Sequence, residues 1–248
     1  MKVDNLEVKK SVTREEMGKV AATDVVKEIK EVISEKGEVN MIFAAAPSQN
    51  DVLKELIASE VDWTKVNAFH MDEYLGLSKT APQRFGNFLC EHIFNHLPFK
   101  SVNLIDSSNP SAEAECKRYT DLLNAFPVDI VVLGIGENGH IAFNDPGVAD
   151  FNDKALIKEA ILDEVCRQQQ VNDKCFDKID DVPKTALTLT VPALCRAKHM
   201  FCVVPAKTKA WAVKETLTGT IDEHCPATIL RRHDHAVLYL DSDSASMI

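Results

Sequence analysis

The sequence predicts an α/β protein in which a mainly parallel central sheet is covered by helices on both faces. Short apolar runs, typical of buried strands, alternate along the chain with longer amphipathic stretches typical of helices. This alternation is the pattern of parallel strands joined by crossover helices. Because no repeat, low-complexity tract or Pro/Gly/Ser-rich linker divides the chain, we expect residues 1–248 to form a single domain.

The predicted strands and helices place the carboxyl ends of the strands along one edge of the sheet, where open α/β sheets bind their ligands. The predicted strands are Met41–Ala45, Val66–Phe69, Val102–Ile105, Asp129–Leu133, Met200–Val204 and Ala236–Leu240. The predicted helices are Glu15–Lys36, Asn50–Ser59, Arg84–His96, Ala112–Ala125 and Thr208–Leu217. The polar stretch Asn152–Asp181 has weak periodicity, and we expect it to form an excursion or lid near the site.

Charge and composition exclude several classes of partner. The net charge of −10 disfavours nucleic acids and anionic membranes, so an anionic small substrate would need a few well-placed donors. The first residues contain no signal-like apolar segment, and no stretch is long enough to span a membrane. The seven cysteines include no Cys-x-x-Cys motif, which favours reduced thiols in the cytoplasm and neither a zinc site nor another cofactor.

A glycine-rich loop follows the predicted strand Asp129–Leu133. In this loop Gly136 and Gly139 precede His140, and Asp145 lies five residues further on. Glycines after a strand let the backbone approach a ligand closely and present N–H groups to it, so both are candidate substrate-binding residues. His140 is the titratable group of the loop near neutral pH and is therefore the candidate acid–base catalyst.

Two other interpretations of this loop remain open. The spacing also satisfies Gly-x-Gly-x-x-Gly, the dinucleotide-binding fingerprint. That fingerprint should open a helix after the first strand of a βαβ unit, whereas Phe143–Gly147 interrupts any helix here. The second interpretation is a tight turn with a packed structural histidine.

Two adjacent carboxylates follow the predicted strand Val66–Phe69. Because neighbouring residues on a strand face opposite sides, one of Asp72 and Glu73 can enter the cleft while the other accepts structural hydrogen bonds. Both are candidate site residues, Glu73 as a substrate-binding residue. A carboxylate in a partly dry cleft has a raised pKa and can act as a base on carbon. The alternative is that both are ordinary polar residues between a strand and a loop.

Ser48 and Lys209 each lie between a predicted strand and a predicted helix. Ser48, with Asp51 three residues later, is typical of a helix N-cap, and N–H groups at a helix start bind phosphate. Lys209 would lie in a first helical turn, where the helix dipole disfavours a cation, which suggests an anionic partner. The alternative for Lys209 is a solvated surface lysine.

Taken together and in this order, these segments resemble the glucosamine-6-phosphate deaminase/isomerase family. The resemblance is carried by an acidic strand end, a glycine–histidine loop and three later segments. They are Phe69–Leu77, Gly134–Pro146, Val182–Thr190, Lys209–Ala210 and Cys225–Leu230.

The resemblance extends over residues 10–242. It implies a Rossmann-like modified α/β fold and a homo-oligomer. The reaction that it implies is the metal-free conversion of glucosamine 6-phosphate and water to fructose 6-phosphate and ammonia. It implies that Asp72 moves a proton between C2 and C1 of the opened sugar. It implies that His140 opens the ring, supported by Asn138 and Asp145. Ser48 and Lys209 fall at phosphate-binding positions.

The chain departs from the family pattern at several positions. The phosphate loop lacks the usual glycines, and Asp145 replaces a glutamate. The family's lid arginine has no clear counterpart, and Arg84 or Arg167 is the candidate replacement. The family's basic and serine allosteric positions are unmatched after Pro146, so we expect no activation by an N-acetylated sugar phosphate. These departures leave galactosamine 6-phosphate open as a substrate.

Two other functions on the same fold also remain open. One is a 6-phosphogluconolactonase-like hydrolase, although that branch usually follows the histidine with a Thr/Ser-containing segment, unlike Ile141–Asn144. The other is a non-catalytic sugar-phosphate sensor, although the short stretch before Thr13 leaves no room for a DNA-binding helix-turn-helix.

Overall fold

The computed structural model of the protein describes residues 1–248 and contains an eight-stranded and a three-stranded sheet. The order of the large sheet is β1-β2-β11-β10-β7-β3-β4-β6, and every neighbouring pair is parallel except β1 and β2. Its strands are β1 (Lys2–Val3), β2 (Leu6–Lys10), β3 (Val39–Phe43), β4 (Val66–His70), β6 (Ser101–Asn103), β7 (Ile130–Leu133), β10 (His199–Val204) and β11 (Ala236–Leu240). The predicted α/β class with a mainly parallel sheet is confirmed.

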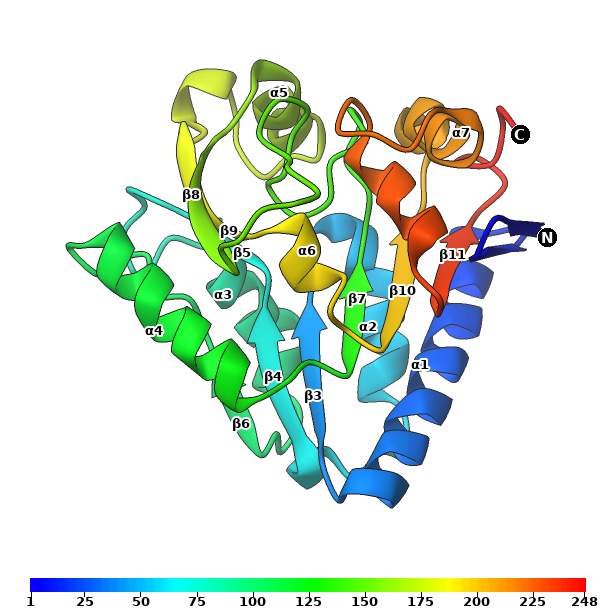
Figure 1. The fold of residues 1–248 in the computed structure, drawn as a ribbon, viewed down its shortest axis with the longest axis horizontal. Helices are drawn as coiled ribbons and strands as arrows, with labels where there is room; N and C mark the ends of the chain where they lie inside the picture. The colour runs from blue at the N-terminus through cyan, green and yellow to red at the C-terminus, as the bar shows by residue number, and fades with distance from the viewer.

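Helices cover both faces of the large sheet, as predicted, because successive side chains of each buried strand point to opposite faces. In β3, Met41 and Phe43 belong to one buried cluster and Ile42 to the other. One face is covered by α1 (Arg14–Lys36), α2 (Asn50–Ile57) and α3 (Phe85–Leu89). The other is covered by α4 (Ala112–Ala125), α6 (Val191–Leu194) and α7 (Ala210–Thr218), of which α4 and α6 are seen in front of the strands in Figure 1.

A small antiparallel sheet lies beyond the carboxyl ends of the large sheet's strands (Figure 1). It consists of β5 (Asp72–Tyr74), β9 (Thr185–Leu189) and β8 (Ile157–Ile161), in that order. The polar stretch Asn152–Asp181, expected as an excursion, supplies β8 and the helix α5 (Glu164–Asn172). This layer covers the edge of the sheet where the predicted site lies.

One predicted helix is only partly α-helical, and the strand β2 was not predicted. The helix predicted over Arg84–His96 is α-helical only over Phe85–Leu89 and continues as a π-helix over Cys90–Phe94. The strand β2 was not predicted because three of its five residues are charged, and pairing with β11 stabilises it. No helix combines the length and apolar character that a bilayer crossing needs.

Candidate active site

A cleft opens at the carboxyl edge of the large sheet, between β3, β4, β7 and the covering layer. The volume of the cleft is about 500 Å³, which includes the space at its open mouth. The polar side chains that line it are Ser48, Gln49, Asp72, His140, Gln169, Gln170 and Lys209. The structure therefore brings the predicted base, the predicted histidine and both predicted phosphate residues to one place.

Asp72 and Glu73 have different surroundings, as their alternation on β5 predicts. Asp72 lines the cleft, and burial, together with the nearby Glu73 carboxylate, raises its pKa well above the ordinary value. Glu73 instead accepts backbone hydrogen bonds from Tyr74, Phe85 and Gly86 at 3.0, 3.0 and 2.9 Å. Burial outweighs these bonds and raises the pKa of Glu73 as well.

Two residues predicted to bind substrate have structural roles here instead. Glu73 does not line the cleft, and Arg84 lies with its Nε 3.6 Å from the Glu73 Oε2. Arg84 is thus held beside a buried carboxylate on the far side of β5 and is also absent from the cleft lining. Its prediction as a phosphate ligand is not supported by this placement.

Arg167, the other candidate for the missing lid arginine, is tied to the backbone. Its guanidinium donates to the carbonyl of Ile179 at 2.6 Å and to that of Val182 at 3.0 Å. These bonds connect α5 to the segment that leads into β9. Arg167 does not line the cleft, because its side chain is used to hold the covering layer together.

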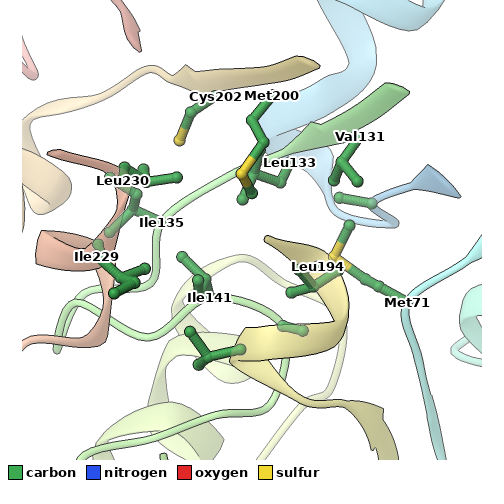
Figure 2. Packing of buried hydrophobic residues seen from close by; sticks show 14 of the residues in the cluster. Met71, Val131, Leu133, Ile135, Ile141, Leu194, Met200, Cys202, Ile229 and Leu230 are labelled. Carbon is green, nitrogen blue, oxygen red and sulfur yellow. The ribbon is translucent and has the colours of Figure 1, made fainter. Parts of the chain in front are cut away.

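His140 is positioned by the glycine-rich loop. A side chain at Gly136 would overlap the imidazole ring, so only glycine lets the ring lie against the backbone at that point. Gly139 has φ of 84°, and its added Cβ would strike Cys225. Ile135 and Ile141, on either side, are buried in the core and anchor the loop near Ile229 and Leu230 (Figure 2).

The two glycines predicted to bind substrate therefore act mainly on the loop itself. The N–H of Gly136 donates to the carbonyl of His140 at 2.9 Å, and the N–H of Gly139 donates to the carbonyl of Gly136 at 3.0 Å. Gly136 lines the cleft, whereas Gly139 does not. Neither N–H group is free to bind a phosphate.

A hydrogen-bond network fixes the tautomer of His140. Its Nδ1 lies 2.8 Å from Asn138 Oδ1 and 3.0 Å from Asp145 Oδ1, and both of these atoms are acceptors. The orientation of the Asn138 amide is set because its Nδ2 donates at 3.0 Å to both Asp145 and Asp163. Nδ1 therefore carries the proton, and Nε2 is left with a lone pair.

Asp145 is kept ionised by the same network. Burial opposes its charge, but the hydrogen bonds from His140, Asn138 and the backbone of Asp163 outweigh burial and lower the pKa of Asp145. The predicted association of Asn138 and Asp145 with His140 is thus present in the structure. An anion beside Nδ1–H stabilises the imidazolium that forms when Nε2 takes a proton.

Lys209 and Ser48 form the candidate anion site. Lys209 lies at the end of a 3-10 turn (Lys207–Lys209) before α7; it is 4% exposed and lines the cleft, and burial lowers its pKa. Its ammonium makes no ion pair within the protein. The Ser48 hydroxyl accepts from Gln49 Nε2 at 3.1 Å and keeps its own proton for a ligand.

The predicted N-cap at Ser48 is wrong. Ser48 lies inside a 3-10 turn (Pro47–Gln49) whose cap residue is Ala46, and the turn has no side-chain cap. Asp51, the expected partner in the capping box, forms an ion pair with Arg14 instead. Ser48 still reaches the cleft, because the turn follows directly from the carboxyl end of β3.

Two glutamines of α5 line the cleft and were not predicted. Gln169 Oε1 accepts from the backbone of Glu137 at 2.8 Å, which joins the covering layer to the glycine loop. Gln170 is buried, yet its side-chain amide makes no hydrogen bond within the protein and faces the cleft. The Gln168-Gln169-Gln170 run was a usable signal, because buried amides need partners.

A buried carboxylate base and an oriented imidazole at the carboxyl edge of a parallel sheet define an α/β acid–base enzyme site. Residues 12–239 match the family model described as glucosamine-6-phosphate isomerases/6-phosphogluconolactonase. Glucosamine-6-phosphate deaminases from Bacillus cereus and Bacillus anthracis are each 38% identical over 219 residues, which is 88% of this chain and 82% of theirs.

Solved structures agree with this assignment. A monomeric glucosamine-6-phosphate deaminase superposes with a TM-score of 0.89 at 30% identity, covering 98% of this chain and 100% of the other. A 6-phosphogluconolactonase from Thermotoga maritima has a TM-score of 0.78 at 19% identity over 95% of this chain and 99% of the other, and it shares the fold. The chain belongs to the glucosamine-6-phosphate isomerase/6-phosphogluconolactonase family.

Proposed function

We propose that the protein converts glucosamine 6-phosphate and water into fructose 6-phosphate and ammonia. The observation that carries this proposal is the convergence of Asp72, His140 and Lys209 on one cleft. The relatives at 38% identity and the structure at 30% identity are glucosamine-6-phosphate deaminases, which supports the same reaction here.

The phosphate group binds Lys209 and Ser48. A buried ammonium that makes no ion pair within the protein is unfavourable on its own, and a phosphate dianion supplies a direct partner for its charge. The free Ser48 proton provides a second contact. Binding at this end fixes the sugar so that its first two carbons lie near Asp72 and His140.

His140 opens the sugar ring. Its Nε2 accepts the proton of the anomeric hydroxyl and returns a proton to the ring oxygen as the bond between that oxygen and C1 breaks. The charged Asp145 stabilises the imidazolium between the two transfers. The product of this step is the open-chain amino aldehyde.

Asp72 then moves a proton from C2 to C1. Its carboxylate takes the C2 proton while a proton of the substrate's ammonium group passes to the C1 oxygen, giving an enolamine. The carboxylic acid then delivers its proton to C1, which leaves a C=N bond at C2. Water adds to C2 and ammonia departs, leaving the ketone of fructose 6-phosphate. Burial suits Asp72 to this role, because a poorly solvated carboxylate is a stronger base than a solvated one.

An ammonia-release assay with glucosamine, galactosamine and mannosamine 6-phosphates tests the substrate. The proposal predicts the highest kcat/KM for glucosamine 6-phosphate, with fructose 6-phosphate formed in equal amount. Release from galactosamine 6-phosphate alone would identify the 4-epimer as the substrate. Hydrolysis of 6-phosphogluconolactone without ammonia release from any amino sugar would replace the proposal with a lactonase.

The predicted homo-oligomer and the cytoplasmic location remain proposals. All seven cysteines are free thiols, which supports a reducing compartment. Sedimentation velocity tests the assembly, and a homo-oligomer predicts a mass that is a multiple of 27.5 kDa. A single species of 27.5 kDa would instead match the monomeric deaminase of similar structure.

A further inference from the structure

A cluster of three potential metal ligands lies behind the His140 imidazole. One donor atom each from His140, Asp145 and Cys166 lies within 4.8 Å of the others. All three residues are buried. Asp145 and Cys166 do not line the cleft, so the cluster is on the inner, Nδ1 side of the ring rather than on the side that faces substrate.

Neighbouring groups hold the Asp145 carboxylate and the backbone of Cys166 in place. Asp145 accepts from Asn138 Nδ2 at 3.0 Å and from the backbone N–H of Asp163 at 3.2 Å. The backbone of Cys166 is fixed in the first turn of α5, where its N–H donates to Asp163 Oδ1 at 2.6 Å. Outer partners of this kind orient the ligands of protein metal sites and maintain their geometry.

The donor set selects a particular class of cation. Thiolate, imidazole and carboxylate together suit zinc-like cations, whereas Mg²⁺ prefers oxygen ligands alone. Metal bonds of about 2.0–2.3 Å to each donor bring the donors to within about 4.5 Å of one another or closer. Because the donors already lie within 4.8 Å, small side-chain shifts are enough to form the site.

We propose that His140, Asp145 and Cys166 form a binding site for Zn²⁺ and similar thiophilic cations, and that occupation of this site inhibits the enzyme. Binding releases the thiol proton of Cys166, and the imidazole proton moves from Nδ1 to Nε2. The lone pair that faces the cleft is then lost, so His140 no longer accepts the proton of the anomeric hydroxyl. The inhibition, unlike the metal binding, rests on the proposed function.

Cadmium is the probe, because a cadmium–thiolate bond absorbs in the ultraviolet and reports binding without any enzyme assay. The reduced full-length protein is titrated with Cd²⁺ while bound metal and absorbance are measured. The wild type is expected to bind one equivalent with thiolate absorbance, and excess Mg²⁺ is expected not to compete. Cys195→Ser, which changes a cysteine outside the cluster, is the matched control and should behave like the wild type.

Cys166→Ser is expected to abolish the absorbance and weaken binding by at least ~10-fold, the lower end of the loss seen even for outer partners. His140→Gln should weaken binding similarly, which provides a second variant if Cys166→Ser unfolds. Unchanged Cd²⁺ absorbance in both variants, or no stoichiometric binding by the wild type, would overturn the site.

A separate measurement of ammonia release tests whether metal binding inhibits the enzyme. Cd²⁺ should inhibit the wild type and Cys195→Ser, chelation should restore the rate, and Cys166→Ser should resist inhibition relative to its own metal-free rate. A wild type that binds Cd²⁺ through Cys166 but is not inhibited would refute the inhibitory role. A wild type with no metal-free ammonia release would count against the proposed function, while the absorbance titration would still decide the metal site.

Discussion

Burial raises the pKa of Asp72 in the folded protein, and this shift links its chemistry to stability. At neutral pH the unfolded chain has a well-solvated carboxylate, whereas the folded chain must keep the charge in a dry cleft. Ionisation of Asp72 therefore reduces the free energy of unfolding. The same environment is what makes the carboxylate a useful base.

Asp72→Asn is expected to raise the melting temperature at pH 7 while lowering kcat by about 10²–10⁴-fold. The melting temperature should rise by ~2–4 °C for each kcal/mol gained in the free energy of unfolding. Because the folded pKa lies above the unfolded one, the stability gain should shrink as pH falls towards the ordinary aspartate range, where both states are protonated. Thermal unfolding at several pH values checks this; a gain that grows on acidification would contradict it.

Gly136 is the residue that makes room for the His140 ring. Gly136→Ala should displace the imidazole, because the added methyl group overlaps it, and should lower kcat by about 10²-fold with little effect on KM. Gly147→Ala is a useful comparison, since a Cβ there meets no other atom, although its φ of 86° adds backbone strain. Equal activity losses in both variants would show that the ring contact is not what matters at Gly136.

Gln170 presents a free side-chain amide to the cleft, and we expect it to hydrogen-bond the substrate. Gln170→Ala should raise KM about 5- to 13-fold with a smaller change in kcat, as the loss of a net hydrogen bond of ~1–1.5 kcal/mol implies. Gln168→Ala, two residues earlier and exposed, is the control. A steady-state comparison in which both variants keep the wild-type KM would remove Gln170 from the site.

At the scale of elements, the start of α5 connects the covering layer to the catalytic network. Asp163 caps α5 through Cys166 N–H, and its other oxygen accepts from Asn138. Asp163→Ala should therefore cost about 1 kcal/mol of stability and also lower kcat, because Asn138 loses a partner that orients it. The Thr13→Ala change at the start of α1 removes only a cap, and it should lower stability with no effect on kcat.

Thermal unfolding and steady-state kinetics of the two cap variants distinguish these effects. If both variants lose stability and neither loses activity, Asp163 acts only on the helix. If Asp163→Ala loses activity even where it is fully folded, the cap and the catalytic network are coupled through Asn138.

The elements that were predicted correctly are those with strong local signals. Strands such as Ile130–Leu133 are apolar throughout, and Ala112–Ala125 has a clear helical period, so both were predicted to within one residue of their observed limits. The strands β5, β8 and β9 were missed because they are short and mixed in polarity. Their stability comes from pairing between residues far apart in the chain, such as Asp72 with Thr188, which no local pattern records.

In the candidate site, too, the residues in local sequence motifs were predictable and those placed by tertiary contacts were not. Asp72 belongs to one short motif at a strand end, and Asn138, His140 and Asp145 belong to another. The meeting of Asp72 and His140 at one cleft follows from the parallel topology. The roles of arginine were not predictable in this way. Arg167 is directed to backbone carbonyls by the tertiary path of residues 179–182, and this path depends on how the covering layer folds.

At the scale of the whole molecule, both ends of the chain contribute to one sheet. The strand Leu6–Lys10 pairs in parallel with Ala236–Leu240, which closes the sheet against the last strand of the chain. We infer from this pairing that residues 1–248 act as a single domain. The rigid sheet sets the distance between the glycine loop after β7 and the acidic strand β5, so the active-site geometry depends on the whole fold.

The most direct measurement is ammonia release from glucosamine 6-phosphate by Asp72→Asn and His140→Gln, with substrate binding by each variant measured calorimetrically. If Asp72 and His140 act on one bound sugar, both variants should bind the substrate and each should lose turnover by about 10²–10⁴-fold. His224→Gln changes an exposed surface residue and should keep the wild-type rate. Wild-type turnover in both Asp72→Asn and His140→Gln would contradict the account.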